Sequence, residues 1–184
     1  MPPLGSRIQA SIRPEQISDR TPIREITTAA FTQSELDYHG EADLIDVLRA
    51  NCTDALSLVA CLQETVVGHI LFTPVVLKSP IGQETGMGIA PLSVAPAHQK
   101  KGIGAKLITE GLAQLNERNN PFVVVLGHPN YYARFGFVPA AQFGISHGFA
   151  GIPQEAFLIQ PNLEGPALTQ LNGTVAHYHP AFGL

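Results

Sequence analysis

A chain of 184 residues can bury one sizeable core, and it is too short for two domains of ordinary size. Hydrophobic residues make up 45% of the chain and charged residues 14%, which is typical of a soluble globular protein. The net charge of −4 disfavours a broad nucleic-acid-binding face, and no apolar run approaches the ~20 residues that cross a bilayer.

The first part of the chain predicts one short strand followed by two helices. Residues 7–13 alternate loosely between apolar and polar side chains, as a short strand does. Thr21 before Pro22 predicts a helix start, because threonine caps a first turn and proline costs nothing at the first helical position. A second helix is predicted over residues 40–50, where apolar side chains share one face.

Two apolar, β-branched runs follow, over residues 56–62 and 65–77. Only a Gln-Glu pair separates them, so the sequence predicts an antiparallel hairpin. A glycine-rich turn is predicted over residues 79–88, and it leads into a strand at residues 89–94.

The middle of the chain predicts a strand–helix–strand crossover. Residues 103–118 carry an apolar stripe at helical spacing, and residues 122–127 form the nearly unbroken apolar run of a strand covered on both faces. Strand, helix and strand within residues 89–127 make a βαβ unit, whose two strands run parallel. With the hairpin before it, this unit predicts an α/β fold with a mixed sheet. Short closing strands are predicted at residues 156–160 and 173–179.

The loop before the predicted central helix combines hydrogen-bond donors with two glycines: Gln99-Lys100-Lys101-Gly102-Ile103-Gly104. Backbone N–H groups in a first helical turn have no intrahelical acceptor, and glycines without a Cβ let an anion approach them. The loop therefore indicates a phosphate site, although a plain tight turn also explains the glycines. It lacks the third glycine of a dinucleotide fingerprint and the Gly-Lys-Ser/Thr of a P-loop.

Pro91 interrupts the strand predicted at residues 89–94. Proline cannot donate to a ladder, so inside a strand it indicates a bulge or a local break in pairing. Such a break would part this strand from its parallel neighbour and leave backbone groups available to a ligand amide. The other interpretation, that Pro91 merely begins the strand, fits the spacing equally well.

Residues 126–137, LGHPNYYARFGF, follow the apolar run at residues 122–127. The carboxyl end of a parallel strand is the usual place for ligands in an open α/β sheet. A tyrosine there can donate a proton to a leaving group, or it can pack with its hydroxyl in water. We expect Tyr131 to pack, whereas the spacing of Tyr132 bears on the resemblance described next.

Two motifs in register resemble the GNAT superfamily of N-acetyltransferases. Residues 99–104, Gln-Lys-Lys-Gly-Ile-Gly, match its Gln/Arg-x-x-Gly-x-Gly/Ala signature, and residues 132–137, Tyr-Ala-Arg-Phe-Gly-Phe, match its Tyr-x-x-x-Gly-Phe landmark. They stand in the correct order, joined by the helix and strand that the family requires. The stretches VVLGHPNYYARFGFVPA and GTVAHYHPAF resemble, more specifically, a bacterial branch of predicted acetyltransferases.

The resemblance implies a GNAT-like fold, with a mixed, mostly antiparallel sheet whose central parallel βαβ pair is splayed at a bulge and flanked by helices. It implies a single N-acetyltransferase domain over residues 1–184. The core of that domain would span residues 7–140, and C-terminal closing strands would lie within residues 141–184.

The resemblance also implies acetyl-CoA as the cosubstrate. Backbone N–H groups of the loop and the first helical turn would hold its pyrophosphate: Gln99, Lys100, Lys101, Gly102, Ile103, Gly104 and Ala105. The backbone of Leu92, Ser93 and Val94 would pair with the pantetheine amides like an added strand, and would polarise the thioester carbonyl.

By position, Tyr132 matches the family's general acid, and a phenol with a pKa near ~10 is protonated at neutral pH. His128 is the first candidate for the general base, because it ends the strand beside the reacting carbon and histidine has a pKa near ~6.5. A turn-shaping role before Pro129 explains His128 equally well. His69 is expected to be a satisfied core or cleft residue. Glu41 opens the second predicted helix, where the family often builds its acceptor pocket, but an acidic residue in a first helical turn needs no further role.

Location and metal content follow from weaker signals. The start of the chain lacks the basic-then-apolar order of a signal peptide. Cys52 and Cys61 have neither the number nor the spacing of a disulfide framework or a zinc site. His177 and His179 have a spacing that permits a metal site, but no carboxylate or thiolate partner is evident. A cytoplasmic protein without a metal is predicted.

Two functions remain open at this point. The first is an N-acetyltransferase in which a primary amine attacks the thioester directly, and the second is a non-catalytic acyl-CoA-binding sensor or regulatory module. A tyrosine acid favours the enzyme, since a pure binder needs none. The acceptor would be a small-molecule or peptide amine, with no nucleic-acid or membrane partner, and a homodimer is compatible with the family.

Acidic residues cluster near the predicted second helix: Glu35, Asp37, Glu41, Asp43 and Asp46. The cluster indicates either a cationic acceptor or a solvated helix face.

Overall fold

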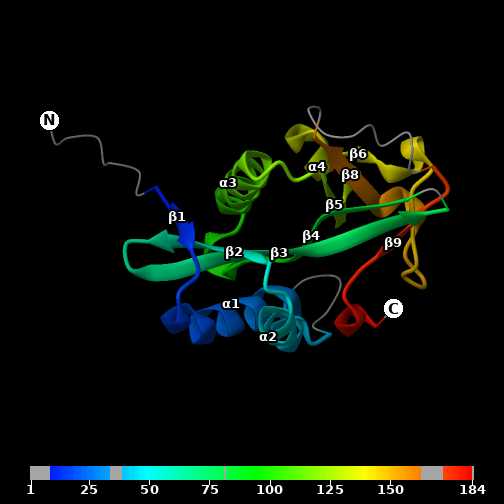
Figure 1. Cartoon of the computed structure of the whole chain (residues 1–184). Helices are drawn as coiled ribbons and strands as arrows, with labels where there is room; N and C mark the ends of the chain where they lie inside the picture. The colour runs from blue at the N-terminus through cyan, green and yellow to red at the C-terminus, as the bar shows by residue number, and fades with distance from the viewer. Residues whose placement is uncertain (1–8, 34–38, 81, 163–171, 184) are drawn as a thin grey trace, which may run out of the picture.

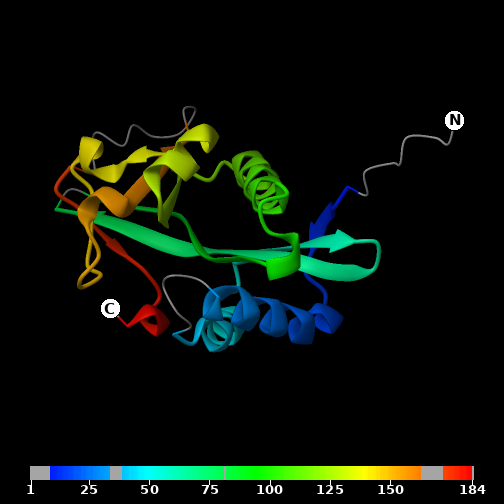
Figure 2. The ribbon, with the colours of Figure 1, turned by 180° about the vertical axis from the view of Figure 1, so that it is seen from behind.

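One sheet with helices on both faces organises the chain (Figures 1 and 2). The computed structural model describes residues 9–33, 39–80, 82–162 and 172–183. The sheet has nine strands in the order β1-β2-β3-β4-β5-β8-β6, and β9 joins it by pairing with β3 and with β7. In Figure 1, α3 and α4 lie above the sheet, and α1 and α2 lie below it.

The strands are β1 (Ser11–Pro14), β2 (Leu56–Leu62), β3 (Thr65–Ser79), β4 (Gly82–Val94), β5 (Phe122–Leu126), β6 (Val138–Pro139), β7 (Ser146–His147), β8 (Phe157–Pro161) and β9 (Val175–His177). The α-helices are α1 (Arg20–Thr32), α2 (Glu41–Asn51), α3 (Ile103–Glu117) and α4 (Pro129–Tyr132). None of the helices within the described ranges is long and apolar enough to cross a membrane.

Both helices predicted in the first part of the chain form, with shifted starts. The N-cap of α1 is Asp19 rather than Thr21, and the Asp19 carboxylate accepts hydrogen bonds from Arg13 and from the Gln16 N–H instead of capping α1. The helix buries one side of its surface, including Ile23 and Thr27, against the sheet.

The predicted hairpin of β2 and β3 is confirmed, and β3 continues into a second hairpin with β4. The prediction of a glycine-rich turn over residues 79–88 was wrong, because β4 already begins at Gly82. A Cβ on Gly86 would lie 2.5 Å from the Phe122 carbonyl oxygen, and one on Gly88 would lie 2.9 Å from the Tyr178 ring. These glycines therefore permit close approach inside a strand, which is a reason for glycine that does not involve a turn.

The predicted βαβ unit is confirmed. Strands β4 and β5 run parallel, with Met87, Gly88 and Ile89 opposite Val123, Val124 and Val125. Helix α3 connects them and packs an apolar stripe onto one face of the sheet. Its approach is close, because a Cβ on Gly111 would lie 2.3 Å from the buried ring of Phe72.

Pro91 lies well inside β4, so the interpretation that it begins a strand was wrong. The pairing of β4 with β3 shifts register between Ile70 and Phe72, opposite the residues around Pro91. Within the described chain, β4 pairs with β5 only as far as Ile89. The two parallel strands therefore part after the bulge, as the first interpretation of Pro91 predicted.

Both predicted closing strands are present, as β8 and β9. β8 pairs with β5 and β6, and β9 pairs with β3 opposite Val76, Leu77 and Lys78. Among the described strands, all of the pairings are antiparallel except β4 with β5 and β7 with β9. The fold is therefore the mixed, mostly antiparallel sheet that was predicted.

Candidate active site

A cavity of about 390 Å³ opens where β4 and β5 part. Its walls are the end of β4, the loop into α3, and the segment that contains α4. The residues that line it are Leu92, Val94, His98, Gln99, Lys100, Gly102, Ile103, Gly104, Ala105, Tyr131 and Arg134. All of the predicted cofactor-binding residues line this cavity except Ser93 and Lys101.

The loop before α3 is shaped by its own hydrogen bonds. The side-chain amide of Gln99 donates to the Val94 carbonyl at 3.1 Å, and the Lys101 ammonium donates to the Ala97 carbonyl at 2.8 Å. Lys100 and Gly102 have positive φ angles of 59° and 82°, so the loop turns tightly just before the helix. Lys101 faces a neighbouring cavity instead.

The start of α3 presents unsatisfied backbone donors to the cavity. The N-cap is Gly102, and no side chain caps the helix. The N–H groups of the first turn therefore lack an intrahelical acceptor and carry partial positive charge. Lys100, His98 and Arg134 line the same cavity, and no acidic residue in the described part of the chain lines it. The arrangement favours an anion.

The backbone of β4 beyond the bulge forms the second wall. Leu92 and Val94 turn their side chains to the α3 face, where they pack on the core. Ser93 points to the opposite face and shares a 3.0 Å hydrogen bond with Thr27 of α1. Since β4 has no described strand partner on the β5 side after Ile89, its backbone here can pair with an extended ligand.

Tyr132 ends α4, in the segment that follows β5, and its side chain is buried in the core next to the cavity residue Tyr131 and is not itself among the residues that line the cavity. Its ring packs so closely on Gly127 that a Cβ there would lie 2.4 Å away. Burial raises the pKa of Tyr132 above its usual value, and the neighbouring Tyr131 adds to the effect. Its hydroxyl makes no hydrogen bond to any residue that the structure describes, and it is protonated at neutral pH.

His128 is the N-cap of α4, and its side chain is exposed. Its carbonyl accepts the N–H groups of Tyr131 at 3.0 Å and Tyr132 at 3.2 Å, so its backbone starts the short helix. Its side chain does not line the cavity. A role as general base remains a prediction.

His69 is a core residue, as predicted, but only one of its ring nitrogens is satisfied, because Nδ1 is buried without a hydrogen-bond partner among the described residues. It is fully buried, and its Nε2 lies 2.9 Å from the Ser57 hydroxyl and 3.8 Å from the Glu15 carboxylate. Burial lowers the pKa of His69, although Glu15 opposes the shift. Arg49 pairs with the same carboxylate at 2.7 Å.

The acidic side chains of α2 that the structure describes make ion pairs and hydrogen bonds at the surface of the helix. Arg24 of α1 pairs with Asp43 and with Asp46, and all three side chains are exposed. Glu41 accepts the backbone N–H of His39 at 2.9 Å. These contacts favour the solvated-face interpretation over a cationic acceptor. Glu35 and Asp37 lie outside the described residues.

The two histidines near the carboxyl end lie in different elements. His177 belongs to β9, whereas His179 lies beyond it and accepts the N–H of Ala181 at 3.1 Å. Among the residues whose placement is described, no three His, Cys, Asp or Glu side chains could hold a metal ion together. That the protein works without a metal remains a prediction.

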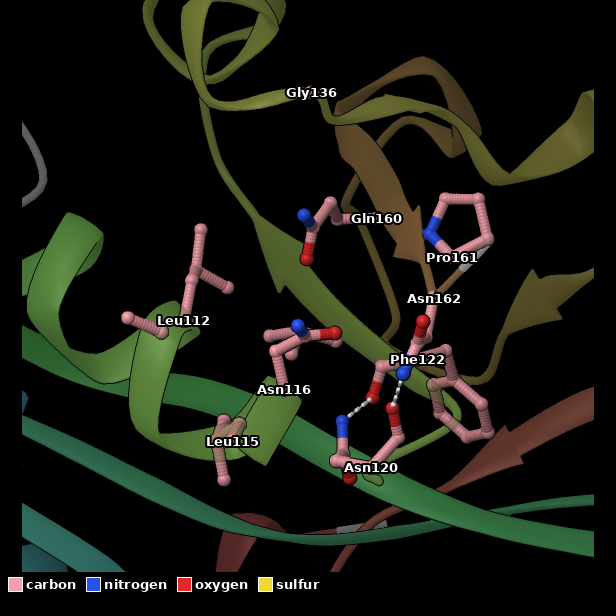
Figure 3. A pocket seen from close by; sticks show the side chains of 11 residues that line it. Leu112, Leu115, Asn116, Asn120, Phe122, Gly136, Gln160, Pro161 and Asn162 are labelled. Carbon is pink, nitrogen blue, oxygen red and sulfur yellow. Dashed lines mark hydrogen bonds between the residues drawn. The ribbon is translucent and has the colours of Figure 1, made fainter. Parts of the chain in front are cut away.

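A larger cavity, of about 510 Å³, lies at the other end of α3 (Figure 3). Side-chain amides gather around it, and the Asn120 amide donates to the Phe122 carbonyl at 2.6 Å. Gln160 points into it from β8, and Leu112 lies on the α3 side. None of the described residues that line it is charged. The described lining of the larger cavity therefore offers no acid, no base and no site for an anion. The smaller cavity, at the end of β4, is the candidate active site.

The sequence-based prediction missed three cavity residues: His98, Tyr131 and Arg134. Tyr131 does pack on the core, as predicted, but its hydroxyl also lies 3.2 Å from where a Cβ on Gly104 would stand. Arg134 follows Tyr131 by three residues, which places both on one side of a helical turn. That spacing was the available signal.

Comparison with known protein families gives a match over residues 11–140 to the model described as an acetyltransferase (GNAT) domain. Two curated relatives come from Escherichia coli (strain K12). The uncharacterized N-acetyltransferase YjhQ is 40% identical over 126 residues, which cover 67% of this chain and 67% of that protein. The uncharacterized N-acetyltransferase YhbS is 35% identical over 154 residues, which cover 83% of this chain and 89% of that protein.

Two solved structures are similar over nearly the whole chain. The Escherichia coli YhbS crystal structure, in complex with CoA, superposes with a TM-score of 0.83 and 32% identity, over 98% of this chain and 96% of that one. A GNAT family acetyltransferase from Brucella melitensis, in complex with acetyl-CoA, superposes with a TM-score of 0.75 and 35% identity, over 96% of this chain and 99% of that one.

Proposed function

The chain belongs to the GNAT family of acetyltransferases, and from this premise we propose that it transfers an acetyl group from acetyl-CoA to a primary amine. Two similar proteins have been solved with CoA and with acetyl-CoA bound. The observation that carries the proposal is the cavity between the parted strands. It joins an uncapped helix start, basic side chains and an unpaired strand edge in one place.

The pyrophosphate would lie on the loop and first helical turn of α3, at residues 99–105. The partial positive charge of the first-turn N–H groups and the Lys100 side chain support this position. The pantetheine arm would run along Leu92, Ser93 and Val94, with its amides paired to the free edge of β4. A backbone N–H of this edge would then polarise the thioester carbonyl.

The reaction follows from this placement. The amine nitrogen attacks the thioester carbon, and the carbon–sulfur bond breaks as the new amide forms. Tyr132 donates its phenolic proton to the departing thiolate, since its raised pKa keeps the hydroxyl protonated at neutral pH. The amine loses its proton to His128 or to a water chain, and solvent restores the tyrosine proton.

The whole chain would act as one N-acetyltransferase domain. β8 lies between β5 and β6 and β9 lies on β3, so residues beyond 140 complete the sheet that holds the cavity. A cytoplasmic location agrees with the free thiols of Cys52 and Cys61. The acceptor would be a small-molecule or peptide amine.

Calorimetric titration with acetyl-CoA tests the proposal. Gly104→Glu places a carboxylate in the first turn of α3 and brings its Cβ within 3.2 Å of the Tyr131 hydroxyl. Gly82→Glu is the matched control, because nothing lies within 4 Å of a Cβ there. We expect saturable binding in the wild type and in Gly82→Glu, and binding at least about tenfold weaker in Gly104→Glu.

Acetyl transfer is then measured as thiol release from acetyl-CoA over a panel of primary amines. The proposal is wrong if the folded wild-type protein binds no CoA species, or if Gly104→Glu binds acetyl-CoA as tightly as the wild type. Circular dichroism of both variants confirms that they are folded.

A further inference from the structure

Arg134 is a cavity residue to which the proposed reaction gives no role. It lies on the short 3-10 turn Ala133–Phe135 that follows α4, and it belongs to the wall formed by this segment. Its side chain is exposed, and within the described ranges it has neither an ion-pair nor a hydrogen-bond partner. All of its N–H donors are therefore available to a ligand.

Aromatic rings hold the Arg134 guanidinium in position. Its central carbon lies 4.2 Å from the centre of the Tyr131 ring and 4.9 Å from that of Phe135, within the range of a cation–π interaction. The Tyr131 ring is itself fixed, since it packs edge-to-face on Tyr132 and its hydroxyl reaches the first turn of α3 at Gly104. The cation is thus oriented before any ligand arrives, which reduces the entropy lost on binding.

We infer that Arg134 binds a phosphate group of the nucleotide half of CoA, an inference that rests on the proposed function. A planar guanidinium stacked on a ring keeps its N–H edge free, and that edge matches two phosphate oxygens. The facing loop contributes Lys100 and the helix start, and none of the described residues that line the cavity carries a carboxylate that would compete. A phosphate between these two walls would be held from both sides.

The role inferred for Arg134 differs from that of the loop before α3. The loop and α3 supply backbone donors, whose position does not depend on any one side chain. Arg134 supplies a full charge from the α4 segment, which also carries Tyr132. Binding of the nucleotide half of CoA would therefore stabilise the position of the segment that contains Tyr132, the proposed acid.

Calorimetry with CoA and with 3′-dephospho-CoA tests the inference on three proteins: wild type, Arg134→Gln and Arg118→Gln. Arg118 is the control, because it lies at the far end of α3 and does not line the cavity. We expect Arg134→Gln to weaken CoA binding by about tenfold, as befits a charged hydrogen bond, and Arg118→Gln to leave it unchanged. The difference in CoA affinity between Arg134→Gln and the wild type should become smaller at high salt.

The two ligands identify the phosphate. A loss confined to CoA assigns Arg134 to the 3′-phosphate, and an equal loss for both ligands assigns it to the pyrophosphate. The inference is overturned if Arg134→Gln binds both ligands like the wild type, if Arg118→Gln loses as much, or if the deficit does not change with salt. Absence of CoA binding in the wild type would overturn the proposed function first, and is thereby distinguished from these results.

Discussion

Tyr132, the proposed acid, has a position and a protonation state that bear on this role. It ends the helical turn directly after β5, beside the point where β4 and β5 part. Burial raises its pKa, so the phenol holds its proton until a strong base forms next to it. A thiolate released into the same apolar surroundings is also a stronger base than in water, which brings the two proton affinities closer together.

Replacement of this hydroxyl is the most direct test at the residue scale. We expect Tyr132→Phe to lower kcat for acetyl transfer by ~10²-fold, because general acid catalysis contributes about that much, and to leave the Kd for acetyl-CoA nearly unchanged. Tyr178→Phe is the control, since Tyr178 is also a tyrosine whose pKa is raised by burial, but its ring packs on Phe149 and Phe182, whereas Tyr132 packs on the cavity residue Tyr131. Unchanged turnover in Tyr132→Phe would remove Tyr132 from the mechanism.

The sequence predicts some residues of this site better than others. The loop at residues 99–105 lines the cavity as predicted, apart from Lys101, because its backbone donors are tied to fixed spacings along the chain. The role of Tyr132 stays a prediction. Arg134 was missed because its importance depends on facing the loop before α3 across a cavity whose described lining holds no carboxylate. The two rings beside Arg134 are local neighbours, but the meeting of these two segments cannot be seen in the sequence.

The same distinction holds for whole elements. The hairpin, α3 and β5 follow from hydrophobic periodicity, which is a local property of the sequence. The glycines at 86 and 88 were misinterpreted as a turn because their reason is tertiary: one meets the Phe122 backbone and the other meets the Tyr178 ring. The sequence left two interpretations of Pro91 open for the same reason. Whether a proline forms a bulge inside a strand or begins the strand depends on the neighbouring strands, which the local sequence does not reveal.

Gly111 of α3 gives a prediction at the element scale. Alanine is intrinsically better in a helix by up to about 1 kcal/mol, but a Cβ at this position would lie 2.3 Å from the fully buried Phe72 ring. Since the ring has no room to withdraw, we expect Gly111→Ala to destabilise the protein by about 1–3 kcal/mol in urea unfolding.

The control for this prediction is Thr109→Ala, on the exposed side of the same helix. It improves helix propensity without meeting the sheet, so its free energy of unfolding should rise slightly or stay the same. A Gly111→Ala variant at least as stable as the wild type would show that α3 can move away from β3 at little cost.

At the scale of the whole molecule, one buried charge network ties the edge of the sheet to a helix. The Glu15 carboxylate follows β1, accepts a hydrogen bond from Ser57 of β2, and pairs with Arg49 of α2. His69 of β3 lies next to it. Glu15 is only 9% exposed, so its charge would be costly without these partners.

This network makes global stability depend on pH. Burial alone would raise the pKa of Glu15, but His69, Ser57 and Arg49 outweigh it and lower the pKa from 4.5 to about 2. A carboxyl whose pKa is lower in the folded state stabilises that state above its unfolded pKa, and the benefit is lost as pH falls towards 2. The shift corresponds to about 3 kcal/mol.

The histidine acts in the same direction at higher pH. The pKa of His69 is lowered by burial, so the unfolded chain takes up a proton below pH ~6.5 that the folded chain refuses. Stability should therefore fall continuously from neutral pH into the acid range. We expect Glu15→Gln to be less stable than the wild type at pH ~7 by about 3 kcal/mol, and to approach it as pH falls below ~4.

Urea unfolding at a series of pH values measures this, with Glu64→Gln in the exposed hairpin turn between β2 and β3 as the control. The control should follow the wild-type curve at every pH, because its carboxylate has no buried partners to lose. If Glu15→Gln also runs parallel to the wild type, the charge of Glu15 contributes nothing to folding. The connection between β1, β2 and α2 would then rest on apolar packing alone.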